Sequence, residues 1–209
     1  MGNKINVRKK DLELFIEKIE GFYKPKIFFE QYTSPAHLVS RLLWIAYLTY
    51  NDIFGKTILD LGAGTGRIGI SAAYLGAKEV LLVEVDYYAI KQAWSNARKT
   101  FLDERVHVIC ADVSYIPLRK KVDVVLQNPP FGMHRKGMDY IFLVNALKYG
   151  NVVYSVHKKE GITFIIRKLK SICRGIELLF EEIVIIPRIY EFHWKNKHKV
   201  NVVAIRVFS

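Results

Sequence analysis

The most chemically specific stretch of the sequence is Asn128-Pro129-Pro130-Phe131, which directly follows a strand-like apolar run at residues 122–127. Two prolines stiffen the backbone and remove its N–H donors, so carbonyl oxygens are the exposed groups. The Asn128 oxygen and a proline carbonyl can both accept from one planar NH₂ group, which makes its nitrogen nucleophilic toward a sulfonium methyl group. Phe131 offers a face for a flipped base. We take these four residues as catalytic candidates over an accidental Pro-Pro turn.

A second chemical signal is the glycine-rich loop at residues 60–66, which reads DLGAGTG. Glycines there let the backbone approach a ligand, with a helix N-terminus behind it. The run from Gly64 to Gly69 also satisfies G-x-G-x-x-G, and Glu84 lies 20 residues after Gly64. This is the dinucleotide fingerprint, so a nicotinamide dehydrogenase is one interpretation. A tight turn that binds nothing is another.

Carboxylates near this loop favour S-adenosylmethionine over a dinucleotide. Asp60 places a negative charge beside a cationic ligand, where it would repel a pyrophosphate. Glu84 can accept from both ribose hydroxyls of either cofactor, and Asp112 follows the third predicted strand, where it could accept from an adenine amino group. We therefore include Asp60 and Gly64 with Glu84 and Asp112 among the cofactor-binding candidates.

Strands and helices that alternate along the chain must position the loops at residues 60–66 and 128–131. Apolar strand-like runs occupy residues 57–61, 80–85, 106–110, 122–127 and 152–156. Helical patterns lie between most of them, at residues 68–75, 87–100 and 140–149. After a helix at 161–173, the strands 176–186 and 199–207 follow one another, so they should pair antiparallel. The pattern predicts a Rossmann-like, seven-stranded α/β methyltransferase sheet with helices on both faces and an antiparallel last strand.

The region before the first strand is expected to be a helical extension at about residues 1–50. Leu12, Phe15, Ile16 and Ile19 have helical spacing. Ser34-Pro35 resembles an N-cap followed by proline at the first helical position, in a second helix that ends near residue 50. No internal repeat or linker is visible, so we expect one domain over residues 1–209.

Composition narrows the class of protein. Of 209 residues, 51% are hydrophobic and 25% charged, which excludes a disordered chain. No apolar run is long enough to span a membrane, and the N-terminus lacks a signal-peptide pattern, so we expect a cytoplasmic protein. The two cysteines, Cys110 and Cys173, are too few for a zinc site, and we expect no metal and two buried thiols.

The net charge is +12, and most of it lies late in the chain. After Pro117 there are 17 basic and 7 acidic residues, a net charge of +10. Such an excess favours a polyanionic partner, although a solvated lysine-rich surface would have the same composition. Three basic clusters should meet at the carboxyl end of the sheet as a phosphate track. The RNA-binding candidates are Arg135, Lys136, Lys158, Lys159, Lys195, Lys197 and Lys199.

Four stretches, taken together, resemble a known family. They are Glu30-Gln31-Tyr32-Thr33-Ser34-Pro35, Asn128-Pro129-Pro130-Phe131-Gly132, Gly137-Met138-Asp139 and Val153-Tyr154-Ser155-Val156-His157-Lys158. From about residue 10 onward, the chain resembles the methyltransferase-like adenine N6-methyltransferases of small-subunit ribosomal RNA. The resemblance implies methylation of the exocyclic N6 of an adenosine in RNA. It also implies cofactor contacts by Gln31, Thr33, Gly62, Thr65, Arg67, Glu84, Asp112 and Val113.

The sequence departs from this family's pattern in places. Glu84 stands where aspartate is common, Arg67 replaces a small apolar residue, and Ser34 is a second candidate for the contact expected of Thr33. Three other functions stay open: a protein glutamine N5-methyltransferase, a DNA adenine methyltransferase, and a non-catalytic RNA-binding ribosome-assembly factor.

The strand at residues 106–110 is expected at one edge of the sheet. It contains no lysine or proline to discourage pairing with another chain. The resemblance implies a small zinc-binding activator protein that docks by adding to this strand. The alternative is that a turn of the chain itself covers the edge.

Overall fold

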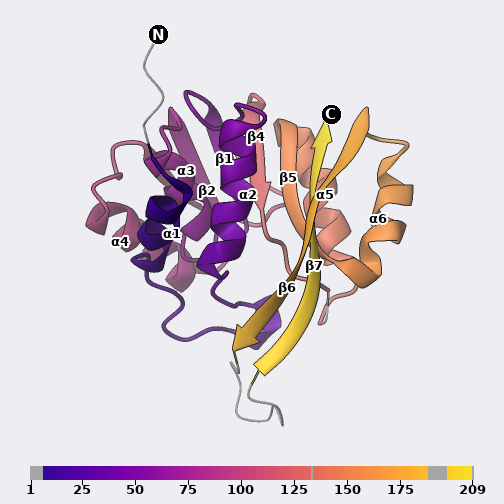
Figure 1. Cartoon of the computed structure of the whole chain (residues 1–209), viewed down its shortest axis with the longest axis horizontal. Coiled ribbons are helices and arrows are strands. Elements are labelled where there is room, and N and C mark those ends of the chain that lie inside the picture. Colours follow the sequence, from indigo (N-terminus) through magenta and orange to yellow (C-terminus); the bar gives the residue numbers. More distant parts are fainter. Residues whose placement is uncertain (1–6, 133, 188–196, 209) are drawn as a thin grey trace.

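The computed structural model describes residues 7–132, 134–187 and 197–208, except for the side chains of residues 186, 187, 197 and 198. Three helical segments precede the sheet: α1 (Lys9–Glu17), the short 3-10 helix η1 (Ile27–Phe29) and α2 (Ala36–Leu48). The helical character expected before residue 50 is therefore observed in this region (Figure 1).

The sheet has seven strands. They are β1 (Thr57–Leu61), β2 (Glu79–Glu84), β3 (Val106–Cys110), β4 (Val122–Gln127), β5 (Gly150–Lys158), β6 (Gly175–Pro187) and β7 (Lys197–Phe208). Their spatial order is β3-β2-β1-β4-β5-β7-β6. The first five are parallel, and β7 lies antiparallel between β5 and β6. The predicted Rossmann-like methyltransferase sheet with an antiparallel last strand is confirmed.

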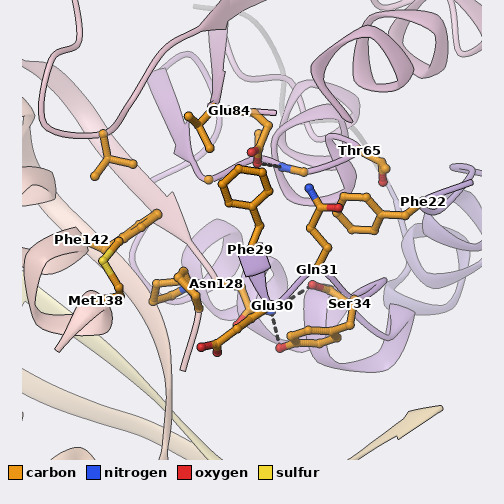
Figure 2. A pocket seen from close by; sticks show the side chains of 18 of the residues that line it. Phe22, Phe29, Glu30, Gln31, Ser34, Thr65, Glu84, Asn128, Met138 and Phe142 are labelled. Atoms are coloured by element: carbon orange, nitrogen blue, oxygen red, sulfur yellow. Dashed lines mark hydrogen bonds between the residues drawn. The ribbon is translucent and has the colours of Figure 1, made fainter. Parts of the chain in front are cut away.

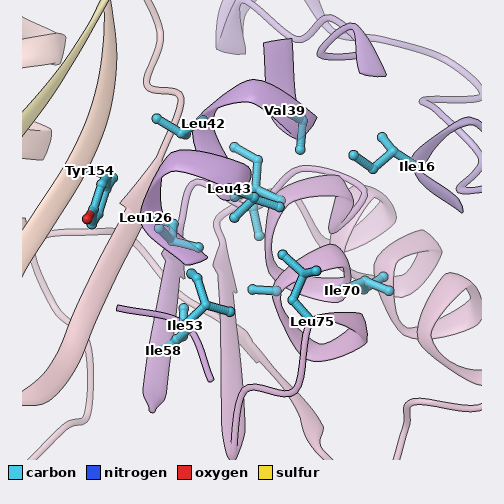
Figure 3. Packing of buried hydrophobic residues seen from close by; sticks show 14 of the residues in the cluster. Ile16, Val39, Leu42, Leu43, Ile53, Ile58, Ile70, Leu75, Leu126 and Tyr154 are labelled. Atoms are coloured by element: carbon cyan, nitrogen blue, oxygen red, sulfur yellow. The ribbon is translucent and has the colours of Figure 1, made fainter. Parts of the chain in front are cut away.

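Helices cover both faces of the sheet (Figure 1). The intervening helices are α3 (Arg67–Tyr74), α4 (Tyr87–Lys99), α5 (Met138–Tyr149) and α6 (Ile162–Leu169), with the 3-10 turn η2 (Lys159–Gly161) before α6. Helices α1 to α4 contribute to one buried cluster, which includes Leu43 and Ile70 and is drawn in Figure 3. Helices α5 and α6 contribute to the other, through residues such as Leu143 and Ile165.

Alternation of side chains along the strands explains this division. Ile58 packs in the first cluster and Leu59 in the second, because successive strand residues point to opposite faces. Both clusters are apolar, so the sheet is fixed between two layers. The carboxyl ends of β1, β2 and β4 then lie side by side, which is where parallel α/β sheets bind ligands.

Two local expectations were wrong. Ser34 does not cap α2: Pro35 is the N-cap residue, with extended backbone, and the hydroxyl of Ser34 bonds elsewhere. Cys110 is exposed and Cys173 is partly exposed, not buried. Cys110 ends β3, which among the described strands has a neighbour on one side only, so burial on β3 is incomplete.

The β6–β7 hairpin extends beyond the rest of the sheet. Pairing between β5 and β7 stops at Lys158 opposite Val202, whereas β6 and β7 stay paired as far as Pro187 opposite Lys197. Because β7 is antiparallel, this extension projects past the carboxyl end of β5. Within the described residues, no helix has the length and apolarity needed to cross a bilayer.

Candidate active site

Asn128 immediately follows β4, and the N-terminal segment holds its side chain. Its Nδ2 donates to the Tyr32 hydroxyl at 2.7 Å and to Ser34 Oγ at 2.9 Å, the dashed lines in Figure 2. Its Oδ1 is buried and has no hydrogen-bond partner in the described part of the chain. Both amide N–H groups are therefore occupied, and the oxygen is the one polar atom of Asn128 still available to a ligand.

Aromatic groups flank this loop. The rings of Tyr32 and Phe131 lie 6.0 Å apart, and Lys158 Nζ stands 5.7 Å from the centre of the Phe131 ring. Burial raises the pKa of Tyr32, so its hydroxyl keeps its proton at neutral pH. The sequence did not predict that Tyr32 and Ser34 would contact Asn128, because the two segments lie more than 90 residues apart.

The glycine-rich loop joins β1 to α3 and depends on residues without a side chain. Gly62 and Gly64 have φ values of 70° and 56°. A Cβ atom at Gly62 would lie 2.7 Å from the Phe142 ring, and one at Gly64 would lie 2.7 Å from the Phe22 ring. The loop can adopt this shape and accept these close contacts only with glycine at both positions.

Glu84, at the end of β2, braces the same loop. Its carboxylate accepts from the backbone N–H of Gly64 and of Asp86, both at 2.9 Å. Burial raises the pKa of Glu84, while these two hydrogen bonds act in the opposite direction. Each carboxylate oxygen has a further lone pair, so Glu84 can still accept from hydroxyl groups of a ligand.

Two predicted cofactor residues beside the glycine-rich loop form hydrogen bonds to the protein backbone. Asp60 is fully buried, does not line the pocket, and accepts from the backbone N–H of Gly69 at 2.7 Å. Burial raises its pKa to about 7. Arg67 donates to the backbone oxygens of Ser34 at 2.7 Å and Ile16 at 2.8 Å. Its guanidinium therefore ties the N-terminal segment to α3, and a direct cofactor contact by either residue stays a prediction.

The N-terminal segment from residue 26 to residue 34 is fastened across the carboxyl end of the sheet. Asp86, after β2, accepts from Lys26 Nζ at 2.7 Å and from Gln31 Nε2 at 2.8 Å. Near β4, Glu30 accepts from the backbone N–H of His134 at 2.8 Å. With the contacts of Tyr32 and Ser34, these bonds fix the segment at both ends of the pocket.

A single pocket brings most of the predicted residues together (Figure 2). The predicted residues that line it are Gln31, Thr33, Gly62, Gly64, Thr65, Arg67, Glu84, Asp112, Val113, Asn128, Pro129, Pro130 and Arg135. Phe131 lies outside that lining. Ser34, the second candidate for the contact expected of Thr33, also lines the pocket. Ten further lining residues were not predicted from the sequence: Phe22, Phe28, Phe29, Glu30, Tyr32, Ala63, Ile68, Val85, Met138 and Phe142. Several of these are aromatic residues before the first strand, and aromatic residues there could equally have packed in the core.

The other basic candidates differ in their surroundings. Lys136 and Lys199 are exposed, and Lys158 is half-buried beside Phe131. Lys159 is exposed and pairs with Glu181. The side chain of Lys197 and all of Lys195 lie outside the described residues.

Next to Asn128, a chain of buried polar side chains joins β4 to β5. Gln127 Nε2 donates to Ser155 Oγ at 2.9 Å, and Ser155 Oγ lies 2.7 Å from His157 Nε2. His157 is fully buried, and Asp139 is 4.0 Å from its Nδ1. Burial lowers the pKa of His157 to about 3, so its imidazole is neutral at physiological pH.

The chain is similar to known methyltransferases in both sequence and structure. Residues 39–148 match the family model of the methyltransferase small domain. The chain is 33% identical to the rRNA N(6)-adenosine-methyltransferase METTL5 of Danio rerio, over 96% of this chain and 98% of the relative. It is 36% identical to the rRNA N(6)-adenosine-methyltransferase Mettl5 of Drosophila melanogaster, over 94% and 92%. A solved structure from Pyrococcus horikoshii, described as a candidate RNA methyltransferase, is 37% identical with a TM-score of 0.84 over 98% of both chains.

The two hydrogen bonds from Asn128 to Tyr32 and Ser34 can be tested without a substrate. A Tyr32→Phe, Ser34→Ala double variant removes both acceptors, at about 1 kcal/mol each. We expect the Nδ2 protons of Asn128 to exchange with water about 10- to 30-fold faster, measured on the side-chain amide signals of ¹⁵N-labelled protein. Tyr50→Phe, which removes a hydroxyl at a different site, is the control. Unchanged exchange in the double variant would show that the hydroxyls do not hold the amide.

The neutral state of His157 predicts a pH dependence of stability. The unfolded chain binds a proton near pH 6.5, whereas the folded chain binds it only near pH 3. Stability from this group is therefore complete above pH 6.5 and falls as the pH is lowered toward 3. Between pH 7 and pH 5 the loss is about 2 kcal/mol. In urea unfolding, His157→Gln should remove that part of the pH dependence, while the exposed His134→Gln should not. Equal slopes in both variants would contradict the assignment.

Proposed function

The chain belongs to the methyltransferase small domain family and to the family of the rRNA N(6)-adenosine-methyltransferases, and we propose that it methylates the exocyclic N6 of an adenosine in small-subunit ribosomal RNA. The observation that carries this proposal is the unpaired Oδ1 of Asn128 in a side chain whose two N–H groups are already bonded.

The residues of the pocket fit S-adenosylmethionine better than a dinucleotide. Three carboxylates line it, those of Glu30, Glu84 and Asp112, and the Glu30 Oε2 atom is buried without a hydrogen-bond partner among the described residues. Two cations line it as well: Arg67, whose guanidinium is bonded to backbone oxygens, and the exposed Arg135. A pyrophosphate would meet mostly like charge here, whereas a cationic ligand with ribose hydroxyls would not. S-adenosylmethionine supplies a methyl group on a positively charged sulfur atom.

Within this fit, five of the predicted cofactor residues have an assigned role. Glu84 would accept from the ribose hydroxyls and Asp112 from the adenine amino group, with Val113 against the ring. The backbone of Gly62 and Gly64 would lie close to the ligand, because neither carries a side chain. The remaining residues of the proposed cofactor set are Gln31, Thr33, Asp60, Thr65 and Arg67.

At the acceptor, the orientation of Asn128 favours an amino group. Oδ1 of Asn128 and the carbonyl of Pro129 would accept the two N–H groups of N6, leaving the nitrogen lone pair directed at the methyl group. The amide N–H groups point to Tyr32 and Ser34, so Asn128 offers no donor to a keto oxygen. The methylated nitrogen is cationic and acidic enough to lose its proton without a dedicated base.

The surroundings of this acceptor position suit a nucleotide. Phe131, in contact with Lys158, would stack on the flipped base while the cation attracts its phosphate. The basic rim proposed for the RNA comprises Arg135, Lys136, Lys158, Lys159, Lys195, Lys197 and Lys199.

The edge strand β3 suits a protein partner. In the part of the chain that the structure describes, β3 pairs with β2 only, and Val108 and Cys110 are exposed. We propose that a small zinc-binding activator protein adds a strand here, as the family resemblance implies. Adding such a protein should then slow hydrogen exchange of the amides of residues 106–110, while the interior strand β2 serves as the internal reference. Unchanged exchange on β3 in a formed complex would place the partner elsewhere.

The central test is methyl transfer from tritiated cofactor to total RNA, DNA and protein. We expect label in RNA adenine, and label only in DNA or in protein glutamine would overturn the proposal. Asn128→Ala should bind cofactor normally in calorimetry but lose transfer about 100- to 1,000-fold. Glu84→Ala should weaken cofactor binding at least tenfold, since a charged acceptor is lost. Asn201→Ala, at an exposed asparagine on β7, is the control. Near-normal transfer by Asn128→Ala would remove its catalytic role.

A further inference from the structure

Much of the chain's net positive charge lies in one short stretch, which begins at the last residue of β5 and includes α6. Residues 158–174 contain six basic side chains and one acidic one, Glu160. The basic residues are Lys158, Lys159, Arg167, Lys168, Lys170 and Arg174. Five of the twelve excess charges therefore lie within 17 consecutive residues.

Most of these cations have no acidic partner, whereas several basic side chains elsewhere do. Lys26 pairs with Asp86, Lys99 with Glu20, and Arg206 with Asp52. Within the described part of the chain, no carboxylate lies within ion-pair distance of Arg167, Lys168, Lys170 or Arg174. All four are exposed. The chain itself does not neutralise this charge, so the surface will attract an external polyanion.

An exposed aromatic ring lies among these cations. Helix α6 buries Ile165 and Leu169 against the sheet, and its outer side carries Phe164, which is 50% exposed. Arg167 Cζ lies 5.8 Å and Lys168 Nζ 5.7 Å from the centre of the Phe164 ring. A nucleobase can stack on an exposed ring while flanking cations bind the adjoining phosphates, which is how single-stranded nucleic acid is held without sequence reading.

The same surface continues from the active site. Lys158 is the last residue of β5, and its ammonium group contacts Phe131 of the catalytic loop. The turn η2 follows, and α6 begins at Ile162, at the outer edge of the molecule in Figure 1. Lys158 and Lys159 therefore lie in the chain between the contact with Phe131 and the ring of Phe164, so RNA with a base at Asn128 would pass basic side chains on its way to that ring.

We propose that the outer face of α6, formed by Phe164, Arg167 and Lys168, binds the single-stranded RNA that flanks the methylated nucleotide, with one base stacked on Phe164. This inference rests on the proposed function, because it takes RNA as the polyanion. It extends the RNA contacts beyond the rim at the carboxyl end of the sheet. A duplex cannot use the ring in this way, because its bases are already stacked.

The test compares binding of the full chain to one fluorescein-labelled single-stranded RNA and to its duplex, by anisotropy over a range of salt concentrations. Phe164→Ala should weaken single-strand binding about tenfold and duplex binding much less. An Arg167→Gln, Lys168→Gln variant should weaken both and reduce the salt slope for the single strand by about 1.4. The matched controls are Phe101→Ala, at a ring that is 90% exposed, and Lys91→Gln, Arg98→Gln on α4.

The possible outcomes distinguish failure of the α6 proposal from failure of the proposed function. If the α6 variants bind RNA as the controls do, the surface is not an RNA site, even when the wild-type chain methylates RNA. If the wild-type chain binds RNA through α6 but transfers no methyl group to it, the function is wrong and the surface stands. If Phe164→Ala instead converts a dimer to a monomer in sedimentation, with RNA binding unchanged, the face binds a second copy and the inference is overturned.

Discussion

The arrangement of this site depends on the side-chain amide of Asn128, whose two N–H groups both donate to hydroxyl groups of the same N-terminal segment. An asparagine side chain can rotate to offer either a donor or an acceptor, and its chemistry differs completely between the two. Here Tyr32 and Ser34 settle the choice, at 2.7 and 2.9 Å. The N-terminal segment has to cross the sheet to bring those hydroxyls there. Its bonds to Asp86 at one end and to His134 at the other can be understood as the means of keeping it in place.

Arg67 joins this arrangement to the glycine-rich loop. It sits at the first turn of α3, yet its guanidinium binds the backbone oxygen of Ser34, whose side chain holds Asn128. Arg67, directly after the glycine-rich loop, and Asn128 are therefore hydrogen-bonded to the same residue, Ser34. This explains why a long cation stands where the resemblance implies a small apolar residue: its side chain fixes the segment instead of making room for it.

Much of the fold could be predicted from the sequence, because strands and helices alternate along it and each carries its own apolar pattern. The strands at 57–61, 106–110 and 122–127 agree residue for residue with β1, β3 and β4. The candidate site was harder to predict from the sequence than the fold. Asn128 and Glu84 could be found because each directly follows or ends a strand, but Tyr32 and Ser34 act through contacts that only tertiary structure creates. Ser34 was misassigned for the same reason: a serine before a helix is typical of a cap, and only a distant asparagine reveals its other bond.

The position of β7 has a consequence for the order in which the enzyme can form. β7 lies between β5 and β6, so β6, although made earlier, has no neighbour in the sheet until β7 arrives. During synthesis on a ribosome, β5 keeps an open edge through the whole of that interval, next to β4, the strand that precedes Asn128. The nascent chain thus acquires its complete sheet only after β7 has emerged.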